Sequence, residues 1–105
     1  MVVLLFVSVL AYGNESNDIL LKMSDAQGND ALAKFMAASG ERCAKVIRNF
    51  YQGFDKRYGA FWNFTCNDGK SYSLMILKDA QVSTRISECS VMQAVGGGQP
   101  CFKKF

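Results

Sequence analysis

The pattern of apolar and polar positions divides the chain into a leader, a polar segment and a patterned region. The first eleven residues, Met1–Ala11, are almost entirely apolar, and residues 14–28 are mostly polar. Behind them, apolar side chains recur every three or four positions, which is the spacing of one helix face. From residue 43 to 77 the chain is rich in β-branched and aromatic residues and partly alternates with a period of two, which is typical of strands. The pattern predicts both helix and sheet.

The apolar leader, Met1–Ala11, has the length of a signal-peptide core and is too short to span a bilayer. Ala11 and Gly13 place small residues where a signal peptidase reads them, so residues 1–13 are expected to be removed. No Lys or Arg precedes the apolar run, so either translation starts upstream or the leader is atypical. The alternative is a buried strand or helix. We favour export because a very polar stretch follows, and we expect no transmembrane segment after cleavage.

A polar arm is expected over residues 14–28, followed by one small domain over residues 29–105. Either Asn29 or Asp30 can cap a short helix whose apolar side chains share one face. Gly40 suits the end of that helix. This helix is expected to cover one face of a sheet.

Three strands are expected to form an antiparallel meander after the helix. Polar turns at residues 54–57 and 67–69 separate them, and the second has the Asp-Gly pair that tolerates the positive φ of a hairpin turn. A short fourth strand at residues 82–86 and a short helix over residues 88–95, capped by Ser87, complete the order. The predicted fold class is α+β: a short helix, a three- to four-stranded antiparallel meander and a short C-terminal helix, with two disulfides.

Four cysteines in a short exported chain point to two disulfides. Cys43 opens one strand of the first hairpin near the point where Cys66 closes its neighbour. Cys89 lies at the start of the last helix, and a reversal at glycines 96–98 returns the chain to Cys101. We therefore predict the pairs Cys43–Cys66 and Cys89–Cys101 over the two other pairings that four cysteines allow. Each bridge is expected to stabilise the domain by roughly 3 kcal/mol.

The cysteine spacing argues against a metal or redox site. The gaps between successive cysteines are 22, 22 and 11 residues, whereas zinc ligands usually lie two to four residues apart and redox cysteines form Cys-x-x-Cys. The chain has no histidine, so it lacks the commonest general base and the commonest metal ligand. We therefore expect no enzyme, no metal and no cofactor. Catalysis without histidine is the least favoured class.

The net charge of +3 comes from twelve basic and nine acidic residues scattered along the chain. A nucleic-acid surface needs a clustered stripe of Lys and Arg, so no nucleic-acid partner is expected. Aromatic residues crowd the first hairpin instead. Trp62, Tyr58 and Tyr51 are candidate anchors for a protein partner, with Lys56 and Arg57 on the adjoining turn. The alternative is that these aromatics form a core divided between two helices and the N-terminal arm.

Three segments resemble small exported proteins without an assigned function from Gram-negative, mainly alphaproteobacterial, bacteria. They are Trp62–Tyr72 (WNFTCNDGKSY), Glu88–Met92 and Cys101–Lys104, and the similarity covers Arg42 to the C-terminus. The resemblance implies a periplasmic or secreted setting and carries no catalytic residue. In layout alone, a helix with an antiparallel meander is also similar to periplasmic inhibitory modules of the PepSY or β-lactamase-inhibitor kind.

These features predict an exported, disulfide-stabilised, non-enzymatic domain that binds a protein partner in the periplasm or outside the cell, as an inhibitor or a chaperone does. The alternative is a carrier that holds a small apolar ligand between the meander and its helices. A ligand extracted with the native protein would favour the carrier, and an empty, well-packed core would count against it.

Overall fold

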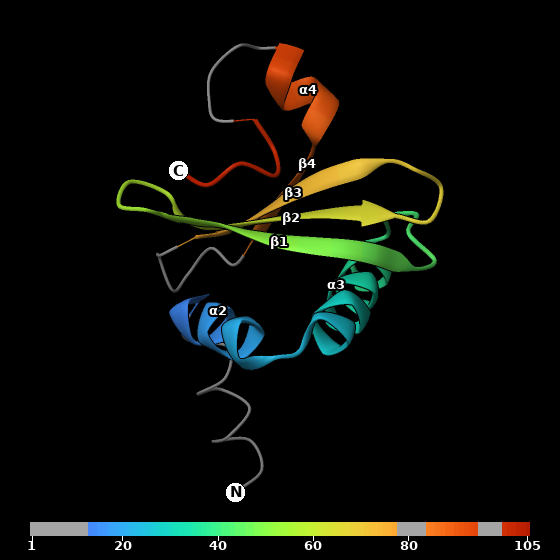
Figure 1. Ribbon diagram of the computed structural model, residues 1–105, viewed down its shortest axis with the longest axis horizontal. Coiled ribbons are helices and arrows are strands. Elements are labelled where there is room, and N and C mark those ends of the chain that lie inside the picture. Colours follow the sequence, from blue (N-terminus) through green and yellow to red (C-terminus); the bar gives the residue numbers. More distant parts are fainter. Residues whose placement is uncertain (1–12, 78–83, 95–99) are drawn as a thin grey trace, which may run out of the picture.

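The computed structural model describes residues 13–77, 84–94 and 100–105 of the chain. Its elements are α2 (Gly13–Lys22), α3 (Asp25–Ala38), β1 (Val46–Asp55), β2 (Gly59–Cys66), β3 (Ser71–Leu77), β4 (Thr84–Glu88) and α4 (Cys89–Ala94). Four antiparallel strands form one sheet in the order β1-β2-β3-β4, with α2 and α3 on one face and α4 on the other (Figure 1). The predicted α+β meander is confirmed. The predicted leader, residues 1–11, and glycines 96–98 lie outside the described residues.

Residues 14–28, predicted as a polar arm before the domain, belong to the first two helices and the link between them. Residues 13–22 form α2, and α3 begins at Asp25 instead of near Asn29. The reason is a capping box: the Ser24 hydroxyl accepts a hydrogen bond from the Gln27 backbone N–H, and the Gln27 side-chain oxygen accepts one from the Ser24 backbone N–H. Because α2 packs on β2 and β3, the packed unit begins well before the predicted domain boundary.

Replacing Ser24 with alanine should lower the free energy of unfolding by about 1 kcal/mol, because the substitution removes the acceptor that caps α3. Denaturant unfolding of the Ser24→Ala variant measures this loss. Ser39→Ala, an exposed serine at the other end of the same helix, is the matched control. Equal losses in the two variants would contradict the capping role.

The strands follow the predicted meander closely. β2 and β3 lie where they are predicted, and Gly69 in the turn between them has a φ of 90°. The fourth strand, predicted at residues 82–86, is observed as β4, and residues 82 and 83 lie outside the described part of the chain. The last helix begins at Cys89, one residue later than predicted, because Glu88 still pairs with Tyr72 in the sheet.

The face of the sheet under α2 and α3 carries the hydrophobic core. Its buried strand residues are Val46, Ala60, Trp62, Phe64, Cys66, Tyr72, Leu74 and Ile76. In β2 they occupy alternate positions, as its pattern predicts. Leu32 and Met36 of α3 close the core from the helix side. Phe64 is fully buried, and its ring stacks on Tyr72 with the centroids 5.7 Å apart. One face of the meander is therefore covered by helix, as expected.

The opposite face of the sheet has a polar centre that the sequence pattern does not predict. Gln52, Asn63 and Ser73 are buried there, with exposed fractions of 2%, 0% and 3%. The Asn63 amide nitrogen donates to the Gln52 side-chain oxygen and to the Ser73 hydroxyl at 3.4 and 3.3 Å. The C-terminal tail, residues 100–105, lies on this face (Figure 1). Among the described residues, every buried side-chain polar atom has a hydrogen-bond partner.

Both predicted disulfides are confirmed. Cys43–Cys66 joins the segment before β1 to the end of β2, with the Cα atoms 5.5 Å apart. Cys89–Cys101 joins the start of α4 to the tail, with the Cα atoms 6.0 Å apart. Two disulfides are compatible with an extracellular or periplasmic location, since such bridges persist in oxidising compartments. None of the helices in the described segments has the length and apolar character needed to cross a bilayer.

Candidate functional site

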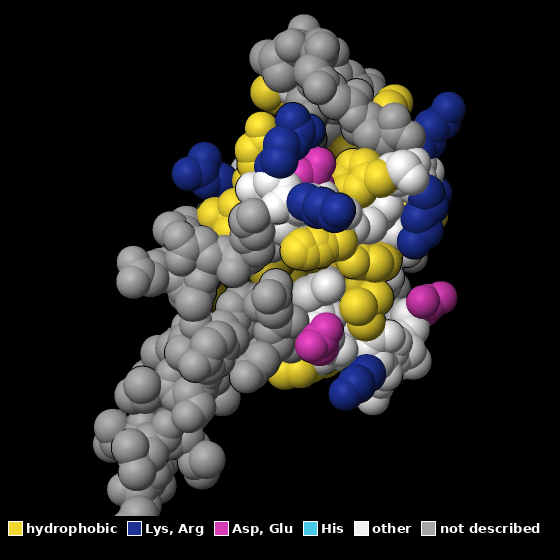
Figure 2. Space-filling view, turned by 90° about the vertical axis from the view of Figure 1, so that its left-hand side faces the viewer, with side chains coloured by type: hydrophobic (Ala, Val, Ile, Leu, Met, Phe, Trp, Pro, Cys, Tyr) yellow, Lys and Arg dark blue, Asp and Glu magenta, His cyan; other side chains and the backbone are white. Residues whose placement is uncertain are grey.

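The end of the β1–β2 hairpin exposes aromatic side chains next to basic ones. Phe54 and Tyr58 are 47% and 48% exposed, and Phe105 of the tail is 55% exposed. Lys56 and Arg57 occupy the turn between the two strands. These five residues are referred to below as the hairpin surface. Figure 2 faces this end of the molecule and shows hydrophobic side chains gathered in the middle, with Lys and Arg side chains around them.

Asp55 shapes the turn that presents these residues. Its carboxylate accepts hydrogen bonds from the backbone N–H groups of Arg57 and Tyr58 at 2.7 and 3.3 Å, and pairs with the Arg57 guanidinium at 3.5 Å. The bond from the Arg57 backbone is the main reason that the pKa of Asp55 lies below its ordinary value of 3.8. The carboxylate is therefore ionised at neutral pH, and the turn loses these bonds only as the pH falls through that lowered pKa.

Phe105 reaches the hairpin surface from the other end of the sequence. Its ring meets the Phe61 ring of β2 edge-on, with the centroids 5.2 Å apart. It also lies against Gly53 of β1, where an added Cβ atom would come within 3.0 Å of the ring. Figure 1 shows the C-terminus on the same side of the molecule as the β1–β2 turn. Phe105 lies with Phe61 on the tail side of the sheet, whereas Phe54 lies on the helix side, so the exposed aromatic residues of the hairpin surface flank the end of the sheet on both faces.

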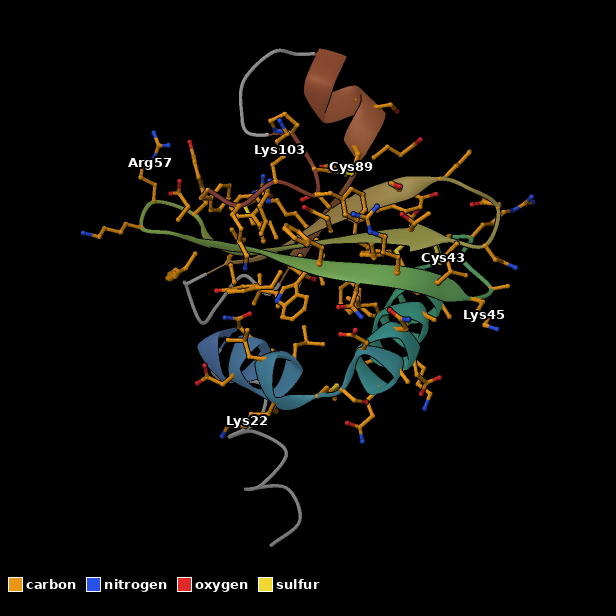
Figure 3. The ribbon with its side chains drawn as sticks, viewed as in Figure 1. Lys22, Cys43, Lys45, Arg57, Cys89 and Lys103 are labelled. Atoms are coloured by element: carbon orange, nitrogen blue, oxygen red, sulfur yellow. A yellow bond between two sulfur atoms is a disulfide. The ribbon has the colours of Figure 1, made fainter. Side chains whose placement is uncertain are left out.

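Basic side chains outnumber acidic ones in this region. Residues 50–58 and 100–105 contain four basic residues and one acidic residue, Asp55, which is paired with Arg57. Arg57 projects from the far end of the sheet, opposite to the end where Cys43 lies (Figure 3). The Lys104 ammonium lies 4.9 Å from the Tyr51 ring centroid. Lys56 and Arg57 therefore supply positive charge at the hairpin end beside the exposed rings, whereas Lys104 lies beside Phe50 and Tyr51, further along β1.

The structure separates the residues that the sequence predicts as a partner surface. Lys56, Arg57 and Tyr58 lie together on the turn, and Tyr51 is half-buried. Trp62 is only 5% exposed, so its prediction as a surface anchor is corrected. The reason is helix α2, which packs over it.

The environment of Trp62 shows how α2 is held. The indole Nε1–H donates to the side-chain oxygen of Asn17 in α2 at 2.7 Å. The indole ring also packs on Tyr51, with the centroids 4.9 Å apart. Buried indole N–H groups usually find such an acceptor. Trp62 and most of Tyr51 therefore belong to the core that joins the sheet to the helices, which is the alternative that the sequence left open.

The sequence pattern does not single out Phe54 or Phe105 as surface residues. Phe54 pairs with Ala60 on the helix side of the sheet, yet it remains 47% exposed. The sequence feature that indicates this exposure is the position of Phe54 at the very end of a strand, just before a polar turn. Phe105 has no local signal, since its position depends on a contact with Phe61, which is far away in the sequence.

A separate apolar groove lies between the two helices and the sheet. Its lining residues are Ser16, Ile19, Leu20, Met23, Ala31, Leu32, Phe35, Leu74, Ile76 and Thr84, and its volume is about 240 Å³. No charged side chain is among them. Leu74 and Ile76 form part of the lining from the sheet, and α2 and α3 form the walls. A small apolar ligand held between the meander and its helices, the alternative function that the sequence leaves open, would occupy this groove.

Metal-ligating side chains do not cluster in the described residues. No three His, Cys, Asp or Glu side chains of this part of the chain lie close enough to hold a metal ion. Asp55 and Arg57 shift each other's pKa, downward and upward respectively, but they lie on an exposed turn and not in a concave site. A comparison with protein-family models, with curated protein sequences and with solved structures gives no match to this chain.

Proposed function

We propose that this chain is an exported, non-enzymatic domain that binds an acidic protein partner through the hairpin surface, as an inhibitor or a chaperone does. The observation that carries the proposal is the exposure of Phe54, Tyr58 and Phe105, each at about half, at the end of the sheet where the turn carries Lys56 and Arg57. Aromatic residues and Arg contribute most of the binding energy at protein interfaces. A positive field speeds the approach of an acidic partner and selects against basic ones.

The hydrogen bonds and the disulfide that hold the β1–β2 hairpin in one conformation favour binding at the hairpin surface. Asp55 fixes the turn through two backbone hydrogen bonds, and the disulfide Cys43–Cys66 joins the two strands at their other end. A surface that is already ordered loses less conformational entropy when a partner binds. Less of the free energy gained from contacts of Phe54 and Tyr58 with a partner is therefore offset by ordering the hairpin.

Export belongs to the same proposal. The two disulfides support it, because they are stable in oxidising compartments and rare in reducing ones. Residues 1–13 would act as the signal peptide, and the mature protein would meet its partner in the periplasm or outside the cell.

A photo-crosslinking amino acid at position 58 tests the proposal in exporting cells. We expect Tyr58→benzoylphenylalanine to give an adduct with an acidic protein, and we expect Lys56→Glu with Arg57→Glu to abolish that adduct. The matched control places the same probe at Ile47, which is 55% exposed near the other end of β1. No adduct at position 58, or equal adducts at both positions, would contradict the proposal.

The apolar groove supports a second candidate function, the carriage of a small apolar ligand. Its volume of about 240 Å³ lies below the range of roughly 300–1,000 Å³ that is usual for small-molecule sites, so only a short alkyl chain or a single ring would fit. Native mass spectrometry of the exported protein tests this candidate. A co-purified ligand that is lost in an Ala31→Trp variant would favour carriage, and a protein of unmodified mass would count against it.

A further inference from the structure

The C-terminal tail, residues 100–105, is held on the sheet by a side-chain amide instead of by regular strand pairing. The Gln52 amide nitrogen donates to the backbone carbonyls of Pro100 and Lys103 at 2.8 and 3.0 Å. The Phe105 backbone N–H donates to the Gln52 backbone carbonyl at 3.2 Å. Gln52 is 2% exposed, so these bonds are shielded from water. One buried residue of β1 therefore binds three backbone groups of the tail.

Asn63 of β2 binds the tail at a second point. Its side-chain oxygen accepts a hydrogen bond from the Phe102 backbone N–H at 2.7 Å, while its amide nitrogen donates to Gln52 and Ser73. The Arg48 guanidinium lies 3.9 Å from the Phe102 ring centroid. Phe102 has a φ of 65°, a left-handed conformation that bulky residues rarely adopt. The tail thus depends on the sheet for its conformation.

One covalent bond also ties the tail down. The disulfide Cys89–Cys101 joins it to α4, directly before Phe102. Cys101 is partly exposed, whereas its partner Cys89 and both cysteines of the other disulfide are buried. A thiolate must reach a sulfur atom in order to attack it. Cys89–Cys101 is therefore the bridge that a reductant reaches first.

We propose that the tail is a disulfide-latched part of the hairpin surface, and that opening Cys89–Cys101 removes Phe105 from this surface. This inference rests on the proposed function and names a regulation of the same site. The step is thiol–disulfide exchange with a dithiol: the Cys89–Cys101 bond is reduced to two thiols, and the dithiol is oxidised to a disulfide.

The latch depends on two opposing contributions: the backbone entropy that the tail regains when it leaves the sheet, and the hydrogen bonds that it then loses. Each tail residue that leaves the sheet regains backbone freedom. The four backbone hydrogen bonds of the tail are largely replaced by bonds to water, so their net contribution is small. The disulfide limits that freedom by holding Cys101 beside α4. Without it, the hydrogen bonds and the ring contacts of Phe102 and Phe105 do not keep Phe105 against Phe61, and the hairpin surface loses the residue that the tail supplies.

Hydrogen exchange at the Phe102 and Phe105 backbone amides tests the latch without any partner. Both N–H groups are bonded to the sheet in the oxidised protein, so we expect both to be protected. In a Cys89→Ser, Cys101→Ser variant we expect both to exchange at least tenfold faster, while the core amides of β2 and β3 keep their rates. Gln52→Leu, which leaves the disulfide in place, should accelerate both amides to a smaller extent. Unchanged exchange in the serine variant overturns the latch.

Stepwise reduction tests which bridge opens. With increasing dithiothreitol and an alkylating reagent, we expect Cys89 and Cys101 to be labelled before Cys43 and Cys66. Labelling in the opposite order overturns the assignment of Cys89–Cys101 as the accessible bridge.

The crosslink at position 58 separates this inference from the proposed function. We expect its yield in the Cys89→Ser, Cys101→Ser variant to fall at least fivefold below that of the parent. A full yield with fast tail amides would overturn the tail's part in the hairpin surface and leave the proposed function standing. Absence of any adduct in the parent counts against the proposed function, and the amide exchange then decides the latch by itself.

Discussion

Replacing Phe54 and Tyr58 together by alanine should weaken binding of the captured partner by about 100-fold or more. Truncating a central aromatic residue of an interface commonly costs about 2 kcal/mol or more, and every 1.4 kcal/mol, roughly, changes a dissociation constant tenfold. Both side chains are about half exposed, so the free energy of unfolding should change by no more than about 1 kcal/mol. Calorimetric titration of the variant and the parent, together with denaturant unfolding, measures both quantities.

Ile47→Ala is the matched control for this double variant. Ile47 is 55% exposed on the same strand, but it lies far from the turn, so its truncation should leave affinity unchanged. Because the partner is expected to be acidic, raising the salt concentration should weaken binding to the parent. If the double variant binds as tightly as the parent, the hairpin surface is not the recognition site.

Removing the Cys43–Cys66 disulfide should lower the free energy of unfolding by about 3 kcal/mol. The bridge joins residues that are 23 positions apart, and a loop of that size restricts the unfolded chain by about this amount. Both cysteines are buried at the edge of the core. For a domain whose total stability is only about 5–15 kcal/mol, the loss is large.

Denaturant unfolding of the Cys43→Ala, Cys66→Ala variant measures this loss. The matched comparison is Cys89→Ala with Cys101→Ala, which opens a bridge between residues 12 positions apart. We expect a smaller loss there, since the bridge closes a shorter loop and ties down only the tail and α4. A larger loss of unfolding free energy in the second variant would contradict the role of Cys43–Cys66 as the disulfide that stabilises the fold most.

Local pattern and chain geometry were sufficient to predict the strands of the sheet and the disulfides that stabilise the fold. The alternation from residue 59 to 66 identifies the core face of β2, because side chains of a strand point to opposite sides in turn. The turn at residues 67–69 sets the pairing of β2 with β3. Once the first hairpin is in register, Cys43 and Cys66 come within bridging distance. These predictions needed only neighbours along the chain or across one hairpin.

Helix α2 and the tail needed information that local pattern does not contain. Four of residues 14–18 (Asn14, Ser16, Asn17 and Asp18) are types that favour turns and caps, yet the segment is helical here, with Asn17 bonded to Trp62 across the core. The Gln52 side chain bonds to tail residues that are 48 and 51 positions away. Contacts at such separations leave no periodic signal. This is why Trp62 could be taken for a surface residue, and why Phe105 was not found.

The most direct test that the hairpin surface binds the partner is a map of the partner's contact on this chain. Backbone amide resonances of the isotopically labelled, oxidised protein would be followed as the captured partner is added. We predict that the largest changes fall on residues 54–58 and 104–105, while the amides of Ala31 and Phe35 beside the apolar groove stay unchanged. Changes centred on the groove between α2 and α3, with residues 54–58 unaffected, would contradict it.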